Sequence, residues 1–115
     1  MKRSFLTLAK RAAALADDKK ALDITLINVQ KLTAETDYVL IASGESTPQV
    51  NAIRESITQT LKDEEGIIPL RCDGRNSVSW SIIDYGGLLI HIISPKMREF
   101  YAIDKIYAEG KALKV

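Results

Sequence analysis

Residues 77–93 read SVSWSIIDYGGLLIHII and contain the pattern that decides the fold. Residues 77–83 alternate between apolar side chains and serines, which predicts a half-buried strand. After the turn residues 84–87, residues 88–93 are apolar on both faces, as expected for a strand in the centre of a sheet. A strand, a four-residue turn and a second strand predict an antiparallel hairpin.

Three further runs predict strands. Residues 23–29 are short and β-branched, and residues 38–42 are continuously apolar, so both favour extended structure. Residues 67–72 predict another short strand. Pro69 favours an edge position for it, because proline cannot donate a hydrogen bond to a neighbouring strand.

Helical spacing predicts three helices. The first follows Ser4, a candidate N-cap, and has a largely alanine stripe within residues 5–16. The second begins within residues 46–49 (STPQ) and should end near Gly66. Either Ser46 forms a capping box with Gln49, or Thr47 is the N-cap and Pro48 takes the first helical position. The third begins at Pro95. Its predicted core-facing residues are Met97, Phe100, Ile103, Ile106 and Tyr107.

The predicted order of elements is α-β-β-α-β-β-β-α. This order predicts an α/β (α+β) fold with a mixed five-stranded sheet flanked by helices. A length of 115 residues fits a single domain over residues 1–115. Within it, we expect residues 111–115 to form a loose tail.

The net charge of +1 hides an uneven distribution of charged residues. Residues 1–20 carry six basic and two acidic residues, residues 21–95 carry five and ten, and residues 96–115 carry five and three. The near-neutral total excludes a uniformly basic nucleic-acid-binding protein. The acidic middle is either a set of solvated faces or a surface that meets a basic partner.

The cysteine content and the lack of long apolar segments indicate the cellular compartment. Cys72 is the only cysteine, which suits a reducing compartment and predicts a small strand residue rather than a nucleophile. No apolar run reaches the ~18–20 residues of a membrane span. Lys10 and Arg11 interrupt the apolar segment that a signal peptide would need. We expect a cytoplasmic protein without membrane contact.

Candidate catalytic groups are few. His91 is the only histidine and lies inside an apolar strand, which favours a buried histidine with satisfied hydrogen bonds. The turn at Ser43 and Gly44 is of the kind that nucleotidyltransferases use, but no pair of carboxylates follows it to hold metal ions. We therefore predict no catalytic residue, no metal and no cofactor. The alternative is a divergent nucleotidyltransferase-like nucleotide-binding protein.

Trp80, the only tryptophan, has two possible environments. If helices cover its face of the strand, it belongs to the core and the serines on the other face meet solvent. If helices cover the serines, Trp80 is exposed and suits the central anchor of a protein interface. The alternating pattern leaves both alternatives open.

Four motifs together resemble the ribosomal silencing factor (Iojap-like) family over roughly residues 4–109. The motifs are residues 37–44 with 49–50, residues 80–86, His91, and residues 98–101. The resemblance implies a non-enzymatic translational repressor. It would bind the large ribosomal subunit through its fourteenth ribosomal protein and sterically block joining of the small subunit when nutrients are scarce. It also implies a fold related to nucleotidyltransferases that lacks their metal-binding carboxylates.

The resemblance also implies which residues bind the partner. By position they are Trp80, Asp84, Tyr85, His91, Arg98 and Tyr101. Phe100 is expected in the core. Two positions depart from the family pattern, since Gly87 stands where an acidic residue is common and Tyr107 where tryptophan is common. We also expect weak contact with ribosomal RNA. An exposed apolar patch around Trp80 would favour a homodimer formed through that patch.

Overall fold

The computed structural model describes residues 4–74 and 79–115. Within them it contains six strands where five were predicted, and two short helices where one was predicted after Pro95. The elements in chain order are α1 (Phe5–Asp18), β1 (Leu22–Asn28), β2 (Tyr38–Ser43), α2 (Thr47–Glu65), β3 (Arg71–Asp73), β4 (Trp80–Asp84), β5 (Leu88–Ile93), α3 (Pro95–Phe100), α4 (Ile103–Ile106) and β6 (Lys111–Leu113).

The strands form one mixed sheet in the order β3-β4-β5-β2-β1-β6. β2 and β5 run parallel, and the other neighbours in the described sheet pair antiparallel. The predicted hairpin is confirmed, with Ile82 of β4 opposite His91 of β5, and β5 lies inside the sheet as expected. β3 is an edge strand as predicted, but it begins only at Arg71, after Pro69. Residues 77 and 78 of the predicted hairpin lie outside the described residues.

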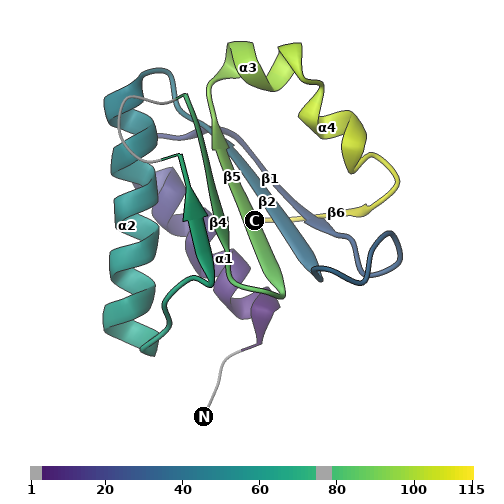
Figure 1. Cartoon of the computed structure of the whole chain (residues 1–115), viewed down its shortest axis with the longest axis horizontal. Coiled ribbons are helices and arrows are strands. Elements are labelled where there is room, and N and C mark those ends of the chain that lie inside the picture. Colours follow the sequence, from purple (N-terminus) through teal and green to yellow (C-terminus); the bar gives the residue numbers. More distant parts are fainter. Residues whose placement is uncertain (1–3, 75–78) are drawn as a thin grey trace.

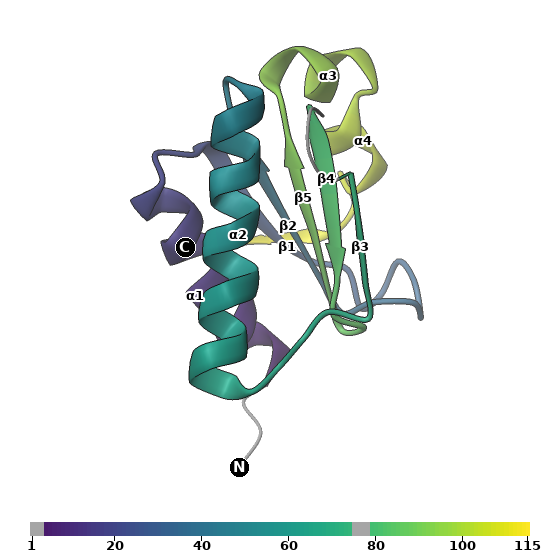
Figure 2. The same ribbon diagram turned by 60° about the vertical axis from the view of Figure 1, so that its left-hand side comes forward.

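Helices cover both faces of the sheet. Figure 2 shows α1 and α2 on one side, and α3 and α4 on the other. The main core lies between the sheet and the two long helices and includes Leu40, Ile57 and Ile90. A second, smaller core on the opposite face includes Ile41 and Ile103. Both faces of the central strands are therefore buried, which explains their continuous apolar sequence.

Local capping groups fix the start of α2 as the sequence predicts. The Ser46 hydroxyl accepts a hydrogen bond from the Gln49 N–H at 3.2 Å. The Gln49 side chain accepts from the Glu45 N–H and also donates to the carbonyls of Lys19 and Lys20, just beyond α1. The capping motif thus joins the end of α1 to the start of α2.

The region after Pro95 corrects two predictions about the core. Ala102 adopts the left-handed conformation (φ +50°) between α3 and α4, so helical spacing does not continue through it. As a result Phe100 is 77% exposed and Ile106 is 62% exposed, and their predicted core positions are wrong. Ile103 is buried as predicted, and Met97 and Tyr107 pack against the second core.

The predicted loose tail at residues 111–115 is wrong for residues 111–113. Residues Lys111–Leu113 form β6, which pairs antiparallel with the outer edge of β1 (Figure 1). Ala112 lies opposite Ile27, and Leu113 packs against the main core. Residues 111–113 are ordered because they pair with the unpaired backbone groups at the edge of β1, which is distant in the sequence. The local sequence does not reveal that this edge is nearby.

Candidate functional site

Five side chains form an aromatic cluster on the sheet face opposite α1 and α2. Trp80 comes from β4, His91 from β5, and Phe100, Tyr101 and Tyr107 from the region of α3 and α4. The ring centroids of Trp80 and Tyr101 lie 5.3 Å apart, and those of Phe100 and Tyr101 lie 4.9 Å apart. These separations are typical of aromatic pairs in contact. The aromatic cluster thus links the sheet with the two short helices above it.

His91 forms the polar centre of the aromatic cluster. Its Nδ1 accepts a hydrogen bond from Trp80 Nε1–H at 3.2 Å, and its Nε2 lies 3.1 Å from the Tyr107 hydroxyl. Its side chain is buried, and burial lowers the pKa of His91 to about 4. The imidazole is therefore neutral at neutral pH. The predicted buried histidine with satisfied hydrogen bonds is confirmed.

The outer side of the aromatic cluster is accessible and apolar. Ser81 is fully buried on the face that α2 covers, whereas Trp80 lies half-buried on the other face. Helices therefore cover the serine face, as in the second alternative, but Trp80 is only half-buried and packs against the second core, so neither alternative holds in full. Tyr101 packs against Trp80 and is 49% exposed, and the exposed Phe100 packs against Tyr101 and extends the apolar surface.

The buried side chain of Arg98 fixes α3 and α4, which carry part of this surface, against the sheet. Its buried guanidinium donates to both carboxylate oxygens of Asp104, at 2.8 and 2.7 Å. It also donates to the Asp23 carbonyl, the Ser43 hydroxyl and the Thr25 hydroxyl. The paired guanidinium lowers the pKa of Asp104. Arg98 thus connects α3 and α4 with β1 and β2.

Two of the predicted partner-binding residues lie away from the aromatic cluster. Asp84, at the other end of β4, accepts the Gly86 N–H at 2.8 Å and shapes the hairpin turn. Tyr85 is buried in the main core on the opposite face, where burial raises its pKa to about 12. At the same turn, the Phe5 ring occupies the space that a side chain at Gly87 would need. A side chain at position 87 therefore does not fit without moving Phe5.

The structure brings together Trp80, His91 and Tyr101 from the predicted set and adds Phe100 and Tyr107. Sequence reasoning placed the added residues in the core because a single helix was expected after Pro95. The break at Ala102 carries no sequence signal, since alanine is the residue that most favours helix.

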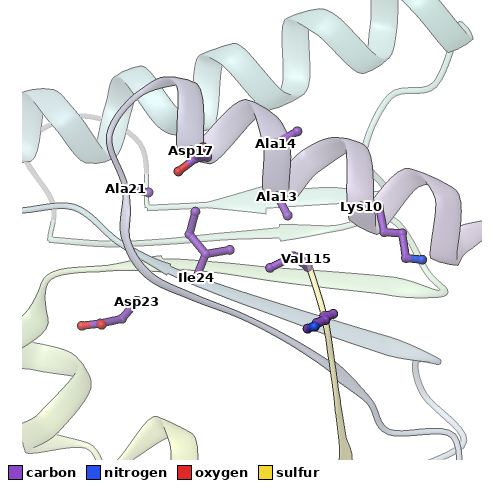
Figure 3. A pocket seen from close by; sticks show the side chains of 9 residues that line it. Lys10, Ala13, Ala14, Asp17, Ala21, Asp23, Ile24 and Val115 are labelled. Carbon is purple, nitrogen blue, oxygen red and sulfur yellow. The ribbon is translucent and has the colours of Figure 1, made fainter.

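A groove of about 650 Å³ lies beside α1, on the far side of the sheet from the aromatic cluster (Figure 3). Ala13 and Ile24 contribute apolar surface, Lys10 lies at one end, and Asp17 and Asp23 lie at the other. Because both signs of charge line it, the groove favours no single class of ligand. Its lining residues are Lys10, Ala13, Ala14, Asp17, Ala21, Asp23, Ile24, Lys114 and Val115.

The described ranges 4–74 and 79–115 hold no group of three or more His, Cys, Asp or Glu side chains that could bind a metal ion. No helix within these ranges is long and apolar enough to cross a membrane. Fold and site together define an α+β protein whose distinguishing feature is an exposed aromatic surface supported by a buried arginine.

Comparison with known proteins identifies the family. The chain belongs to the ribosomal silencing factor family, because the family model "Ribosomal silencing factor during starvation" matches residues 2–115. The chain is 32% identical to ribosomal silencing factor RsfS of Bacillus subtilis over 104 residues, which cover 90% of this chain and 87% of that protein. It is 31% identical to the chloroplastic protein Iojap of Arabidopsis thaliana over 110 residues, 96% of this chain and 44% of that protein.

A solved structure agrees with this assignment. A crystal structure of a Chromobacterium violaceum protein is similar with a TM-score of 0.88 and 27% identity, covering 92% of this chain and 88% of that one. The resemblance predicted from four motifs is therefore confirmed. Membership of this family also confirms the prediction of a non-enzymatic factor.

Proposed function

We propose that this chain is a translational repressor that binds the large ribosomal subunit through its fourteenth ribosomal protein and sterically blocks joining of the small subunit. Membership of the ribosomal silencing factor family supports the repressor role. The observation that carries the proposed docking mode is the accessible side of the aromatic cluster, where Phe100 and Tyr101 are exposed beside the half-buried Trp80. Tryptophan and tyrosine are enriched at the centres of protein interfaces, where a few such residues supply most of the binding energy.

The predicted binding residues then divide by exposure. Tyr101 and Trp80, with the added Phe100, would contact the partner. His91 and Arg98 have little exposed surface and would hold these rings in position. Asp84 and Tyr85 would shape and support the hairpin turn.

Charge plays a smaller part in this proposal. Ribosomal proteins are usually basic, so an acidic middle segment would assist their approach. Part of that acidity is neutralised within the molecule, because Glu64 of α2 forms a bidentate pair with Arg11 of α1 at 3.0 and 2.9 Å. Weak contact with ribosomal RNA, homodimer formation and a cytoplasmic location remain predictions.

The test is binding of the purified chain to isolated large subunits, followed by addition of small subunits. We expect the chain to sediment with large subunits and to prevent formation of joined ribosomes. Tyr101→Ala should weaken binding about 30-fold, as expected for a central interface residue. Ile68→Ala is the matched control, since Ile68 is 67% exposed outside the aromatic cluster and its loss should change nothing.

Two results would contradict the proposal. A chain that does not bind large subunits is not a silencing factor of this kind, and a Tyr101→Ala variant that binds normally places the docking surface elsewhere. A melting shift that requires both magnesium and a nucleoside triphosphate would instead support the nucleotidyltransferase-like alternative.

A further inference from the structure

We propose that the Tyr107 hydroxyl donates a hydrogen bond to a carbonyl or carboxylate oxygen of the bound partner, and that His91 is the positioning residue that directs the hydroxyl to this role. The inference rests on the proposed function, because it places the donor in the aromatic cluster that would contact the partner. It adds a directional polar contact to a surface that is otherwise apolar.

The first step concerns the proton on His91. The indole Nε1–H of Trp80 can only donate, and it donates to His91 Nδ1 at 3.2 Å. Nδ1 must therefore carry no proton. Burial lowers the pKa of His91 to about 4, so the neutral ring holds its single proton on Nε2.

The second step concerns the proton on Tyr107. The protonated Nε2 of His91 lies 3.1 Å from the Tyr107 oxygen, so that oxygen accepts the hydrogen bond. The hydroxyl proton must then point to another acceptor. Among the described residues the hydroxyl has no other hydrogen-bond partner. Burial also raises the pKa of Tyr107, which keeps the hydroxyl protonated.

The third step concerns the place of this donor. Tyr107 is half-buried immediately after α4, and its ring lies 5.9 Å from that of His91. It packs against the second core, as the half-buried Trp80 also does, and His91 contacts both rings. A partner that presents an acceptor to this fixed donor gains a hydrogen bond. A partner without such an acceptor leaves the donor unpaired and binds more weakly. The hydroxyl would therefore set orientation and specificity more than affinity.

The tautomer can be measured without any partner. Because the chain has one histidine, the nitrogen-15 NMR spectrum of its imidazole reports His91 alone. At neutral pH we expect a protonated Nε2 and an unprotonated Nδ1. A spectrum with the proton on Nδ1, or with the two tautomers in rapid exchange, would overturn the proposal.

The donor role is tested by Tyr107→Phe, which removes one hydroxyl and keeps the ring. We expect about tenfold weaker binding to isolated large subunits, because an acceptor on the partner loses its donor. Tyr38→Phe is the matched control, since Tyr38 is half-buried and packs against the main core on the other face. That variant should bind like the unmodified chain.

The outcomes separate this inference from the proposed function. If the unmodified chain binds and Tyr107→Phe binds equally well, the donor role is wrong and the proposed function stands. If the unmodified chain does not bind large subunits, the proposed function fails and the donor role fails with it. Weaker binding by Tyr107→Phe together with an unchanged melting temperature supports the proposal.

Discussion

His91 can hold the aromatic cluster together only while its ring is neutral. Protonation of Nδ1 would remove the acceptor for Trp80 Nε1–H. Burial lowers the pKa of His91 from its ordinary 6.5 to about 4, so the unfolded chain binds more protons than the folded one between these values. The stabilisation is fully present above pH 6.5 and is lost as the pH falls toward 4.

We therefore expect the free energy of unfolding to fall by about 3 kcal/mol between pH 7 and pH 4 because of His91. Urea denaturation at a series of pH values measures it, and His91→Phe should lack this slope. The stabilisation from Asp104, whose pKa is lowered by Arg98, is present above its ordinary pKa of 3.8 and is lost only as the pH falls below that value, so the two pH windows are distinct. An equal slope in His91→Phe between pH 4 and 6.5 would assign the effect to other groups.

Single residues differ in how well sequence predicts them. His91 was predictable because an apolar run on both sides leaves a histidine few outcomes other than burial. The environment of Trp80 was not predictable, because period-two alternation defines two faces without indicating which one the helices cover. The sequence of one strand cannot supply this information, because the face that is covered depends on where α1 and α2 pack relative to the whole sheet.

Arg98 determines whether α3 and α4 remain attached to the sheet. We expect Arg98→Met to lower the free energy of unfolding by about 3 kcal/mol, because several partly buried acceptors lose their donor. The control is Arg11→Met. Arg11 also forms a bidentate pair, with Glu64, but the two side chains are 41% and 44% exposed, so its loss should destabilise the fold far less than the loss of Arg98.

Both variants can be measured by urea denaturation at neutral pH and then by binding to large subunits. Arg98→Met should also weaken binding, because it loosens the helices that present Phe100 and Tyr101. Equal destabilisation by the two variants would show that the buried network adds nothing beyond a surface ion pair.

The elements that sequence predicts well are those with local signals at their ends. α1 and α2 begin directly after Ser4 and Ser46, whose hydroxyls cap them, and α2 is followed by Gly66 in the left-handed conformation. The break at Ala102 and the order in β6 depend on packing against distant strands. Neither has a local signal, which explains why both were missed.

At the scale of the molecule, the helices cover the two faces of the sheet to different extents. The long helices α1 and α2 cover one face, and the short helices α3 and α4 lie on the other (Figure 2). On that second face Phe100 and Tyr101 of the aromatic cluster remain exposed. A standard interface needs about 800 Å² per partner. That is a small part of the 6864 Å² accessible surface, so one face suffices for a factor that acts by occupying space.

The last strand supports this arrangement from the edge of the sheet. β6 follows α4 and pairs with β1, so α4 is held on one side by the ion pair of Asp104 with Arg98 and on the other by β6. Deletion of residues 111–115 should lower the free energy of unfolding by about 2 kcal/mol, since it removes strand pairing and the packing of Leu113. It should also promote self-association, because it exposes the edge of β1.

Urea denaturation and sedimentation at several concentrations measure these two effects. Deletion of residues 114–115 alone is the control, because it leaves β6 intact. The longer deletion should also weaken binding to large subunits, since α4 carries the exposed Ile106 and leads into Tyr107. If both deletions leave stability, sedimentation and binding unchanged, β6 contributes nothing, and the aromatic cluster depends on Arg98 alone for its attachment to the sheet.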